Sequence, residues 1–157
     1  RVFSKGGNMT VNATQIHATC ISIDGIGLIL RGPSGSGKSD LALRLMERSA
    51  QLIADDRVDL TCVDGVLIGR APDRLSGLLE VRGIGIIEVP YGSSVRVWGL
   101  IDLVNRTKIE RLLDTRTEVL CGIDLPCFLI DPSASSAEAK VRLVSGLVSG
   151  SIMRTDD

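Results

Sequence analysis

The feature that most constrains this chain is a glycine-rich loop that lies between a predicted strand and a predicted helix. Residues 32–39 read GPSGSGKS and match the pattern G-x-x-x-x-G-K-[ST] at every fixed position. Just before the loop, apolar residues alternate around Asp24-Gly25, which predicts a β-hairpin. After it, leucine, alanine and methionine recur at helical spacing over residues 39–50. In this context main-chain N–H groups at the start of a helix bind phosphate.

The residues of the loop are expected to share the binding of a nucleotide. Glycines let consecutive N–H groups turn toward an anion, and the positive end of the helix adds to their attraction. Lys38 is expected to reach the β- and γ-phosphates, and the Ser39 hydroxyl to bind Mg²⁺. A glycine turn that only caps a helix is the alternative. The predicted nucleotide-binding residues are Gly32, Pro33, Ser34, Gly35, Ser36, Gly37, Lys38 and Ser39.

The rest of the chain reads mainly as strands separated by turns. We predict strands at 51–54, 78–89 and 95–104, a second hairpin at Asp64-Gly65, a helical turn near 107–114, a strand pattern over 117–131 that Pro126 breaks, and a terminal helix whose Ser135 and Glu138 have capping-box spacing. The predicted fold is a single α/β P-loop domain over residues 1–157, with a mixed sheet and hairpins. Residues 1–14 are expected to form a flexible segment.

Composition excludes several classes of function. The 18 basic and 19 acidic residues nearly cancel and aromatic residues make up 3%, which argues against nucleic-acid binding. The four cysteines form no C-x-x-C pair and are predicted to be reduced, mostly buried thiols. No apolar run reaches the 18 residues of a membrane span, and no signal-peptide pattern opens the chain. We therefore expect a cytoplasmic protein without a membrane partner.

Two adjacent carboxylates are the first candidates for chemistry beside the loop. Asp55 and Asp56 follow a short apolar strand after the predicted helix, so a βαβ arrangement would bring them to the phosphate site. Because side chains alternate along a strand, one should face the site and the other should not, unless the chain turns there. The pair could divide metal binding and proton abstraction between them. A solvated strand end or a helix cap is the alternative.

Glu80 and His17 are further candidates that the residues alone leave open. Glu80 lies in the apolar pattern LLEVRG, where burial of a carboxylate requires a cation. It is either a functional acid or an ion-pair partner of Arg82, two residues on. His17 opens the first predicted hairpin, and a lone histidine is more often a structural residue than a functional one.

The segments IHATCISIDGIGLILRGPSGSGKSDLALRLMERSAQLIADDRV and LLEVRGIGIIEV together closely resemble the catalytic domain of bacterial HPr kinase/phosphorylase. The resemblance covers residues 16–89 well and the remainder loosely. It implies a fold similar to the nucleotide-binding domain of phosphoenolpyruvate carboxykinase and, commonly, a hexamer. It also implies phosphorylation of a serine of the phosphocarrier protein HPr with ATP and Mg²⁺. In the reverse reaction, inorganic phosphate attacks the phosphoserine and pyrophosphate is released.

The resemblance also assigns roles to individual residues. It implies that Lys38 binds the γ-phosphate, that Ser39 and Glu80 bind Mg²⁺, and that Asp56 is the general base, or the general acid in reverse. His17 corresponds to an active-site histidine. Arg111 corresponds to an active-site arginine, although Arg106 or Arg116 could take that role, and a solvated helix arginine is the alternative. The candidate catalytic residues are therefore His17, Lys38, Asp55, Asp56 and Arg111.

The chain departs from the family in two ways. By this resemblance the chain is expected to begin almost directly at the catalytic domain, as the short proteobacterial forms do. The family has a basic loop linked to dephosphorylation, whereas the corresponding residues 125–133, LPCFLIDPS, contain no basic side chain. The sequence therefore leaves the reverse reaction open. It also leaves open two other functions, a kinase that acts on a small-molecule hydroxyl and a regulatory module that senses ATP without transferring phosphate.

Overall fold

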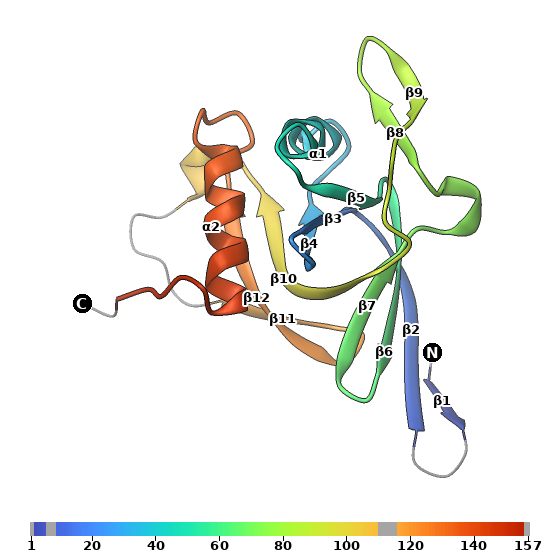
Figure 1. The fold of residues 1–157 in the computed structure, drawn as a ribbon. Helices are drawn as coiled ribbons and strands as arrows, with labels where there is room; N and C mark the ends of the chain where they lie inside the picture. Colours follow the sequence, from blue (N-terminus) through green and yellow to red (C-terminus); the bar gives the residue numbers. More distant parts are fainter. Residues whose placement is uncertain (1, 6–8, 110–115, 156–157) are drawn as a thin grey trace.

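The computed structural model describes residues 2–5, 9–109 and 116–155 of the 157-residue chain. Among these, ten strands belong to one strongly curved sheet, two form a separate hairpin, and two α-helices pack on one side (Figure 1). The main path of the sheet is β1 Val2–Lys5, β2 Met9–His17, β6 Arg57–Val63, β7 Val66–Arg70, β10 Val95–Leu103, β4 Ile26–Arg31, β3 Thr19–Ile23 and β5 Gln51–Ala54. Off this path, β12 Ile123–Ile130 pairs with β10, and β11 Arg116–Leu120 pairs with β12. The separate hairpin consists of β8 Leu78–Val81 and β9 Gly85–Glu88. The helices are α1 Lys38–Met46 and α2 Ala137–Ser149, and there are 3₁₀ turns at Asp73–Leu75 and Arg106–Lys108.

Strand β10 connects the two halves of the sheet. Its first residues, Val95 and Arg96, pair antiparallel with β7. Its later residues pair parallel with both β4 and β12. The sheet therefore curls at β10 and changes from an antiparallel half to a mixed half. This arrangement confirms the predicted α/β class with a mixed sheet and hairpins.

Strand β4 has apolar side chains on both faces, and each face lies in a different core. Leu28 and Leu30 pack under α1 and α2, while Ile29 faces the core enclosed by the curled sheet. All three are fully buried. Since successive side chains of a strand point to opposite faces, a strand covered on both sides reads as a continuous apolar run. The position of β4 at the centre of the fold holds the glycine loop that follows it.

The loop and the paired aspartates meet at one edge of the sheet because of strand direction. Strand β3 pairs antiparallel with β4 on one side and with β5 on the other. Therefore β4 and β5 run in the same direction, with β3 between them, and their carboxyl ends lie at the same edge. Residues 32–37 leave β4 there and lead into α1, and Asp55 follows β5 at the same edge.

Several local predictions hold and others do not. Both Asp-Gly hairpins form, at β3–β4 and β6–β7, and all four cysteines are free thiols, two of them buried. The break at Pro126 is wrong, because β12 runs through it and the chain instead turns at 121–122. Pairing with β10 begins only at Cys127, so the missing N–H of Pro126 disrupts no bond on that side. Helix α2 has Ser136 at its N-cap, without a side-chain capping bond. Residues 9–14 lie in β2 and pair with β6 from Val11 onward.

Gly27 allows the close approach of β4 and β10, and we expect Gly27→Ala to destabilise the fold. A Cβ there would overlap the carbonyl oxygen of Arg96 and lie 2.6 Å from Val95 Cγ1. Overpacking of this kind costs about 1–3 kcal/mol, to be measured by urea unfolding. Gly25→Ala is the matched comparison, since its Cβ meets open space and the change costs only the strain of a positive φ, about 1 kcal/mol. A Gly27→Ala variant as stable as the parent would contradict this packing.

Candidate active site

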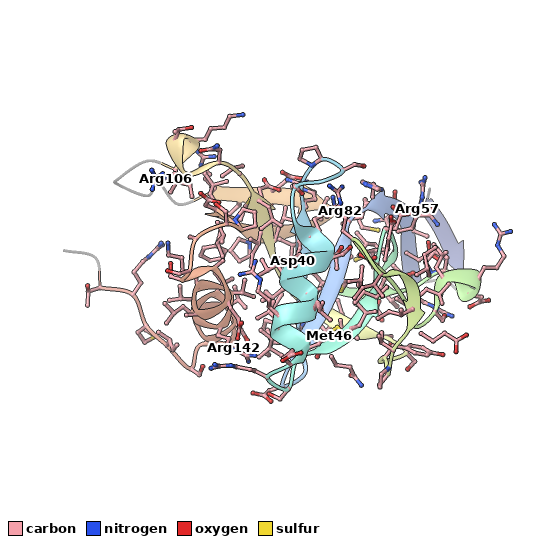
Figure 2. All side chains as sticks on the ribbon, turned by 90° about the horizontal axis from the view of Figure 1, so that it is seen from above. Asp40, Met46, Arg57, Arg82, Arg106 and Arg142 are labelled. Atoms are coloured by element: carbon pink, nitrogen blue, oxygen red, sulfur yellow. The ribbon has the colours of Figure 1, made fainter. Side chains whose placement is uncertain are left out.

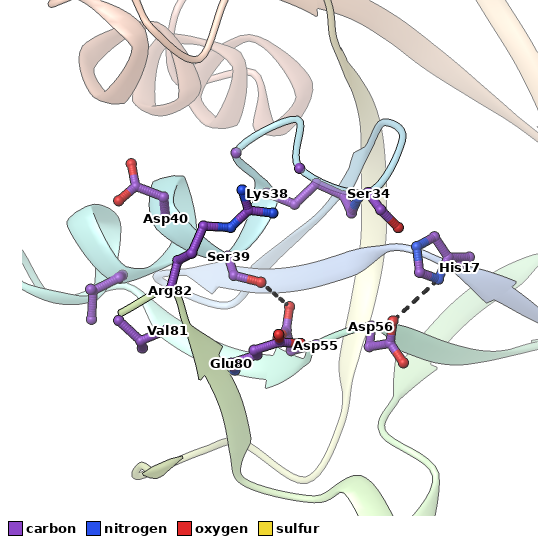
Figure 3. Close-up of a pocket in the computed structure, with 13 residues that line it drawn as sticks. His17, Ser34, Lys38, Ser39, Asp40, Asp55, Asp56, Glu80, Val81 and Arg82 are labelled. Carbon is purple, nitrogen blue, oxygen red and sulfur yellow. Dashed lines mark hydrogen bonds and ion pairs between the residues drawn. The ribbon is translucent and has the colours of Figure 1, made fainter. Parts of the chain in front are cut away.

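The glycine loop borders a pocket of about 520 Å³ at the N-terminus of α1. Gly35 and Gly37 have φ values of +80° and +102°, which a residue with a side chain rarely adopts. Gly37 is also the N-cap of α1, so the loop leads directly into the positive end of the helix. Side chains from the loop, from the end of β5, from His17 and from the β8–β9 hairpin point into the pocket (Figure 3). Five of the eight predicted loop residues line the pocket, and Gly32, Pro33 and Ser36 do not. Four of the five candidate catalytic residues line it as well: His17, Lys38, Asp55 and Asp56.

Lys38 occupies the pocket in a conformation that contacts its own loop. Its Nζ donates hydrogen bonds to the carbonyl oxygens of Gly32 at 2.6 Å and Pro33 at 3.1 Å. Burial lowers the pKa of the ammonium, and the nearby Asp55 and Asp56 partly oppose that shift. Ser36 Oγ, in the same loop, is buried and has no hydrogen-bond partner. A buried hydroxyl without a partner is costly, which fits a loop organised for a polar ligand.

Asp55 holds the base of the pocket through three hydrogen bonds. Its Oδ1 accepts from Ser39 Oγ and from Thr19 Oγ1, each at 2.8 Å. Its Oδ2 accepts from the backbone N–H of Glu80 at 3.3 Å. The carboxylate is only 6% exposed, so most of its acceptor capacity is already used inside the protein. Asp55 is therefore suited to orient Ser39 and the β8–β9 hairpin rather than to take a proton from an incoming group.

Thr19 was not among the sequence candidates. We expect Thr19→Val to lower the free energy of unfolding of the protein. Its hydroxyl is fully buried and donates to a buried carboxylate. Loss of a hydrogen bond to a charged group typically costs about 1.5–3 kcal/mol. Thr19→Ser keeps the hydroxyl and is the control for the lost methyl group. Urea unfolding should rank the parent and Thr19→Ser above Thr19→Val, and an equally stable valine variant would contradict the role assigned to this bond.

Asp56 faces the open part of the pocket beside His17. Its Oδ1 lies 3.3 Å from His17 Nδ1 (Figure 3). Its Oδ2 lies 4.0 Å from Nε of Arg57, the next residue in the chain. The two aspartates were expected to point in opposite directions, yet both line the pocket. The reason is the turn that the prediction allowed for, because β5 ends at Ala54 and Asp56 has a φ of +69°. The side chain of Asp56 is 59% exposed, so its carboxylate is accessible to a substrate.

Glu80 lines the pocket from β8, but its environment differs from the expected one. Leu79 is the buried residue of this strand, whereas Glu80 is exposed, so burial requires no compensating cation. Within the described residues no ion pair joins Glu80 to Arg82, although both line the pocket. The expectation of a buried acid is thus wrong, and the pairing alternative has no support in this geometry. The Glu80 carboxylate is open to a ligand.

The strand before the loop is fixed by a charged cluster. Arg31 Nε and Nη2 donate to the two carboxylate oxygens of Asp102 on β10, at 2.8 and 3.0 Å. The same guanidinium donates to both carboxylate oxygens of Glu118 on β11. These bonds lower the pKa of Glu118, and burial raises that of Cys127, beside Asp102, to about 11. Because Gly32 follows Arg31 directly, the cluster fixes the point at which the loop begins.

Comparisons with known proteins place this site in a family. Residues 8–130 match the family model described as HPr Serine kinase C-terminal domain. This chain belongs to that family. Among the relatives named HPr kinase/phosphorylase, that of Clostridium acetobutylicum is 49% identical over 83 residues, which are 52% of this chain and 27% of the relative. That of Clostridium beijerinckii is 41% identical over 100 residues, 64% of this chain and 32% of the relative.

A solved structure supports the same assignment for the fold. The structure described as the HPr(Ser) kinase/phosphatase from Coxiella burnetii is 31% identical, with a TM-score of 0.75. The match covers 88% of this chain and 95% of that one. The chain spans about a third or less of the length of the Clostridium relatives. The predicted family and the predicted P-loop fold are both confirmed, and the matched residues of the HPr kinase domain include every residue that lines the pocket.

The arginine expected in this HPr kinase domain site is not located by the structure. Arg111 lies outside the described residues. The two substitutes, Arg106 and Arg116, do not line the pocket, and Figure 2 shows Arg106 well away from it on the other side of α1. Arg82 does line the pocket (Figures 2 and 3). Sequence reasoning weighed Arg82 only as a partner of Glu80, although its place two residues after a pocket acid was a usable signal.

The oxygen atoms around Ser39 fit a hard divalent cation. Ser39, Asp55 and Glu80 all line the pocket, and Mg²⁺ is typically held by one or two carboxylates together with substrate phosphates. Within the described ranges, no three histidine, cysteine, aspartate or glutamate side chains form a ready-made metal cluster. The residues of this HPr kinase domain therefore suit a cation that arrives with its nucleotide. None of its helices in those ranges is long and apolar enough to cross a membrane.

Proposed function

We propose that this chain is an ATP-dependent kinase that phosphorylates a serine of an HPr-type phosphocarrier protein. The observation that carries the proposal is the placement of an accessible carboxylate, Asp56, on the same pocket as the phosphate-binding loop. Kinase chemistry needs these two parts within reach of one another. Membership of the HPr kinase family and the names of the relatives supply the acceptor.

In the proposed step, Asp56 accepts the proton of the substrate serine. The serine oxygen then forms a bond to the γ-phosphorus, and the bond between that phosphorus and the β–γ bridging oxygen breaks, so that ADP leaves. His17, 3.3 Å from Asp56 Oδ1, orients the carboxylate. Lys38 releases its own loop carbonyls and neutralises charge on the moving phosphoryl group.

Ser39 and Glu80 would hold the Mg²⁺ that accompanies ATP, and Asp55 would orient the Ser39 hydroxyl. The cation would supply neutralisation of the β- and γ-oxygens. Asp55 already accepts from Ser39, Thr19 and the Glu80 backbone, so it can position two ligand groups at once. This division of roles explains why the chain needs two adjacent aspartates, one buried and one accessible.

The same residues would serve the reverse reaction, which we include in the proposal. An oxygen of inorganic phosphate would attack the phosphorus of the phosphoserine, and the bond between that phosphorus and the serine oxygen would break. Asp56 would give a proton to the serine oxygen, and pyrophosphate would leave. The stretch 125–133 without basic side chains forms most of β12 and the following turn, and Leu125, Ile130 and Asp131 are buried there. Any positive charge that aids this step must therefore come from elsewhere in the chain.

Mass spectrometry of an HPr-type protein, after incubation with this chain and ATP·Mg²⁺, tests the forward reaction. A gain of one phosphoryl group on a serine is expected, followed by its loss when inorganic phosphate replaces ATP. Phosphorylation of a metabolite pool, with the phosphocarrier unmodified, would favour a small-molecule kinase. Binding of ATP without ADP production in the presence of either acceptor would favour a nucleotide sensor.

Assembly and location form part of the same proposal. By its resemblance to the family we expect a homo-oligomer, and a hexamer in particular, which light scattering on the purified chain would measure. A cytoplasmic location follows from the proposed use of ATP and a phosphocarrier protein.

A further inference from the structure

The turn between β11 and β12 has a cysteine at the position where the two Asp-Gly hairpins have aspartate. Its central residues, Cys121 and Gly122, have φ values of +53° and +81°. The pairs Asp24-Gly25 and Asp64-Gly65 have almost the same values, +50° and +82° in the first and +51° and +79° in the second. Two-residue turns with positive φ at both positions favour Asn-Gly and Asp-Gly. The geometry of the turn therefore does not explain the cysteine at position 121.

The thiol of Cys121 is directed at β6, next to a second cysteine (Figure 1). Its Sγ donates to the carbonyl oxygen of Leu60 at 3.9 Å. Cys62 lies two residues further along the same strand, on the same face, and is buried in the core against which Cys121 packs. The next residue of the turn agrees with this placement, because a Cβ on Gly122 would lie 3.1 Å from Nδ2 of Asn12, which pairs with Cys62. The two cysteines are thus neighbours in space, although they are far apart in the sequence.

A surface pocket gives access to one of these thiols and not to the other. Cys121 is partly exposed and lines a pocket of about 400 Å³ together with residues of β2 and β11. Cys62 is only 7% exposed and does not line this pocket. In thiol–disulfide exchange an accessible sulfur first forms a mixed disulfide, and a second sulfur then displaces the external group. The pocket and the buried neighbour provide for both steps.

We propose that Cys121 and Cys62 are a modification site at which a low-molecular-weight disulfide forms a reversible protein disulfide. The Cys121 thiolate attacks one sulfur of the external disulfide, so that one small thiolate leaves and a mixed disulfide remains. The Cys62 thiolate then attacks Cys121 Sγ and releases the second small thiolate. The two cysteine protons end on the two released thiols. The protein loses two electrons, and the external disulfide gains them.

The proposed bond would connect β6 to the strand pair β11–β12. Strand β6 begins directly after Asp56, and β11 carries Glu118, whose carboxylate accepts hydrogen bonds from Arg31 just before the glycine loop. A cross-link between residues 62 and 121 closes a long segment of the chain and removes conformations from the unfolded state. The oxidised protein should therefore unfold at a midpoint about 5–10 °C higher than the reduced protein.

The test is incubation of the folded parent with oxidised glutathione, followed by alkylation of free thiols and mass spectrometry. We choose about pH 8.5, because burial raises the pKa of the Cys121 thiol and exchange needs the thiolate. The parent should lose two hydrogen atoms without gaining glutathione, and peptide mapping should find Cys62 joined to Cys121. Dithiothreitol should restore both thiols. A parent that keeps four alkylatable thiols, while the urea-unfolded chain is oxidised under the same conditions, would overturn the proposal.

Three variants separate the two steps of the exchange. Cys62→Ala should stop at the mixed disulfide and retain one glutathione on Cys121. Cys121→Asn should form neither product, and it should fold because Asn-Gly suits this turn. Cys127→Ala is the control and should form the same bond as the parent, since Cys127 lies on β12 with its thiol directed at Asp102.

Two further results would contradict the proposed pair. A disulfide that peptide mapping assigns to Cys20 or Cys127, or one that joins two molecules on a non-reducing gel, would place the reactive thiols elsewhere. A lower unfolding midpoint after oxidation would show that the native arrangement of β6 and the β11–β12 turn does not accommodate the bond.

Discussion

Lys38→Ala is expected to lower the rate of phosphoryl transfer by about 1,000-fold. Within the described residues Lys38 is the one lysine that lines the pocket, and the transition state gathers negative charge where its ammonium can reach. The variant should remain folded, because the two carbonyl oxygens that Lys38 contacts belong to a loop that borders the open pocket. The measurement is the initial rate of phosphoserine formation on an HPr-type protein, followed by mass spectrometry.

Lys140→Ala is the matched control for this change. Lys140 is exposed on α2 and lies outside the pocket, so its removal should leave both the rate and the unfolding midpoint unchanged. An alanine variant at position 38 that transfers phosphate at the parental rate would refute the role given to the loop lysine. A large drop in its unfolding midpoint would instead show that the side chain supports the fold.

Asp56→Asn is expected to slow transfer by a factor of about 10²–10⁴, the usual contribution of a positioned general base. Asparagine keeps the shape of the side chain but cannot accept the serine proton. Binding of ATP·Mg²⁺ should change little, since Asp56 makes none of the described contacts to the loop, whereas Asp55 bonds Ser39 directly. The rate at saturating ATP and the affinity for ATP are measured separately.

Asp124→Asn makes the same chemical change on an exposed residue of β12 and should behave as the parent. Asp55→Asn provides a second contrast, because it weakens the hydrogen bonds to Ser39 and Thr19 and should reduce affinity as well as rate. If Asp56→Asn transferred phosphate normally and Asp55→Asn lost only the rate, the roles of the two aspartates would be reversed.

Local signals predicted much of the fold because each depended on few residues. The Asp24-Gly25 and Asp64-Gly65 turns need positive φ values that aspartate and glycine tolerate, and both formed. Pro126 misled the prediction because its effect depends on which edge of the strand needs an N–H donor. Here the neighbour on that edge is β10, which lies more than 20 residues earlier in the chain and pairs with β12 only from Cys127 onward. The sharing of β10 between two halves of the sheet likewise depends on pairings that no short pattern encodes.

In the candidate site, too, local signals were predicted well and features that depend on distant residues were not. The loop and the aspartates were found from spacing, since residue type and order define them. The orientation of Asp56 depended on a backbone turn, and the exposure of Glu80 depended on which face of β8 meets the core. Thr19 was missed because its contact is with a residue distant in sequence, Asp55.

The position of β3 between β4 and β5 also sets the spacing between the two sides of this pocket. Neighbouring strands lie about 4.8 Å apart, so the interposed strand separates the two carboxyl ends by about 10 Å. Directly adjacent strands would leave only half that width between the nucleotide-binding loop and the proton acceptor. That spacing gives the pocket its width at this edge of the sheet, with the loop on one side and the two aspartates on the other.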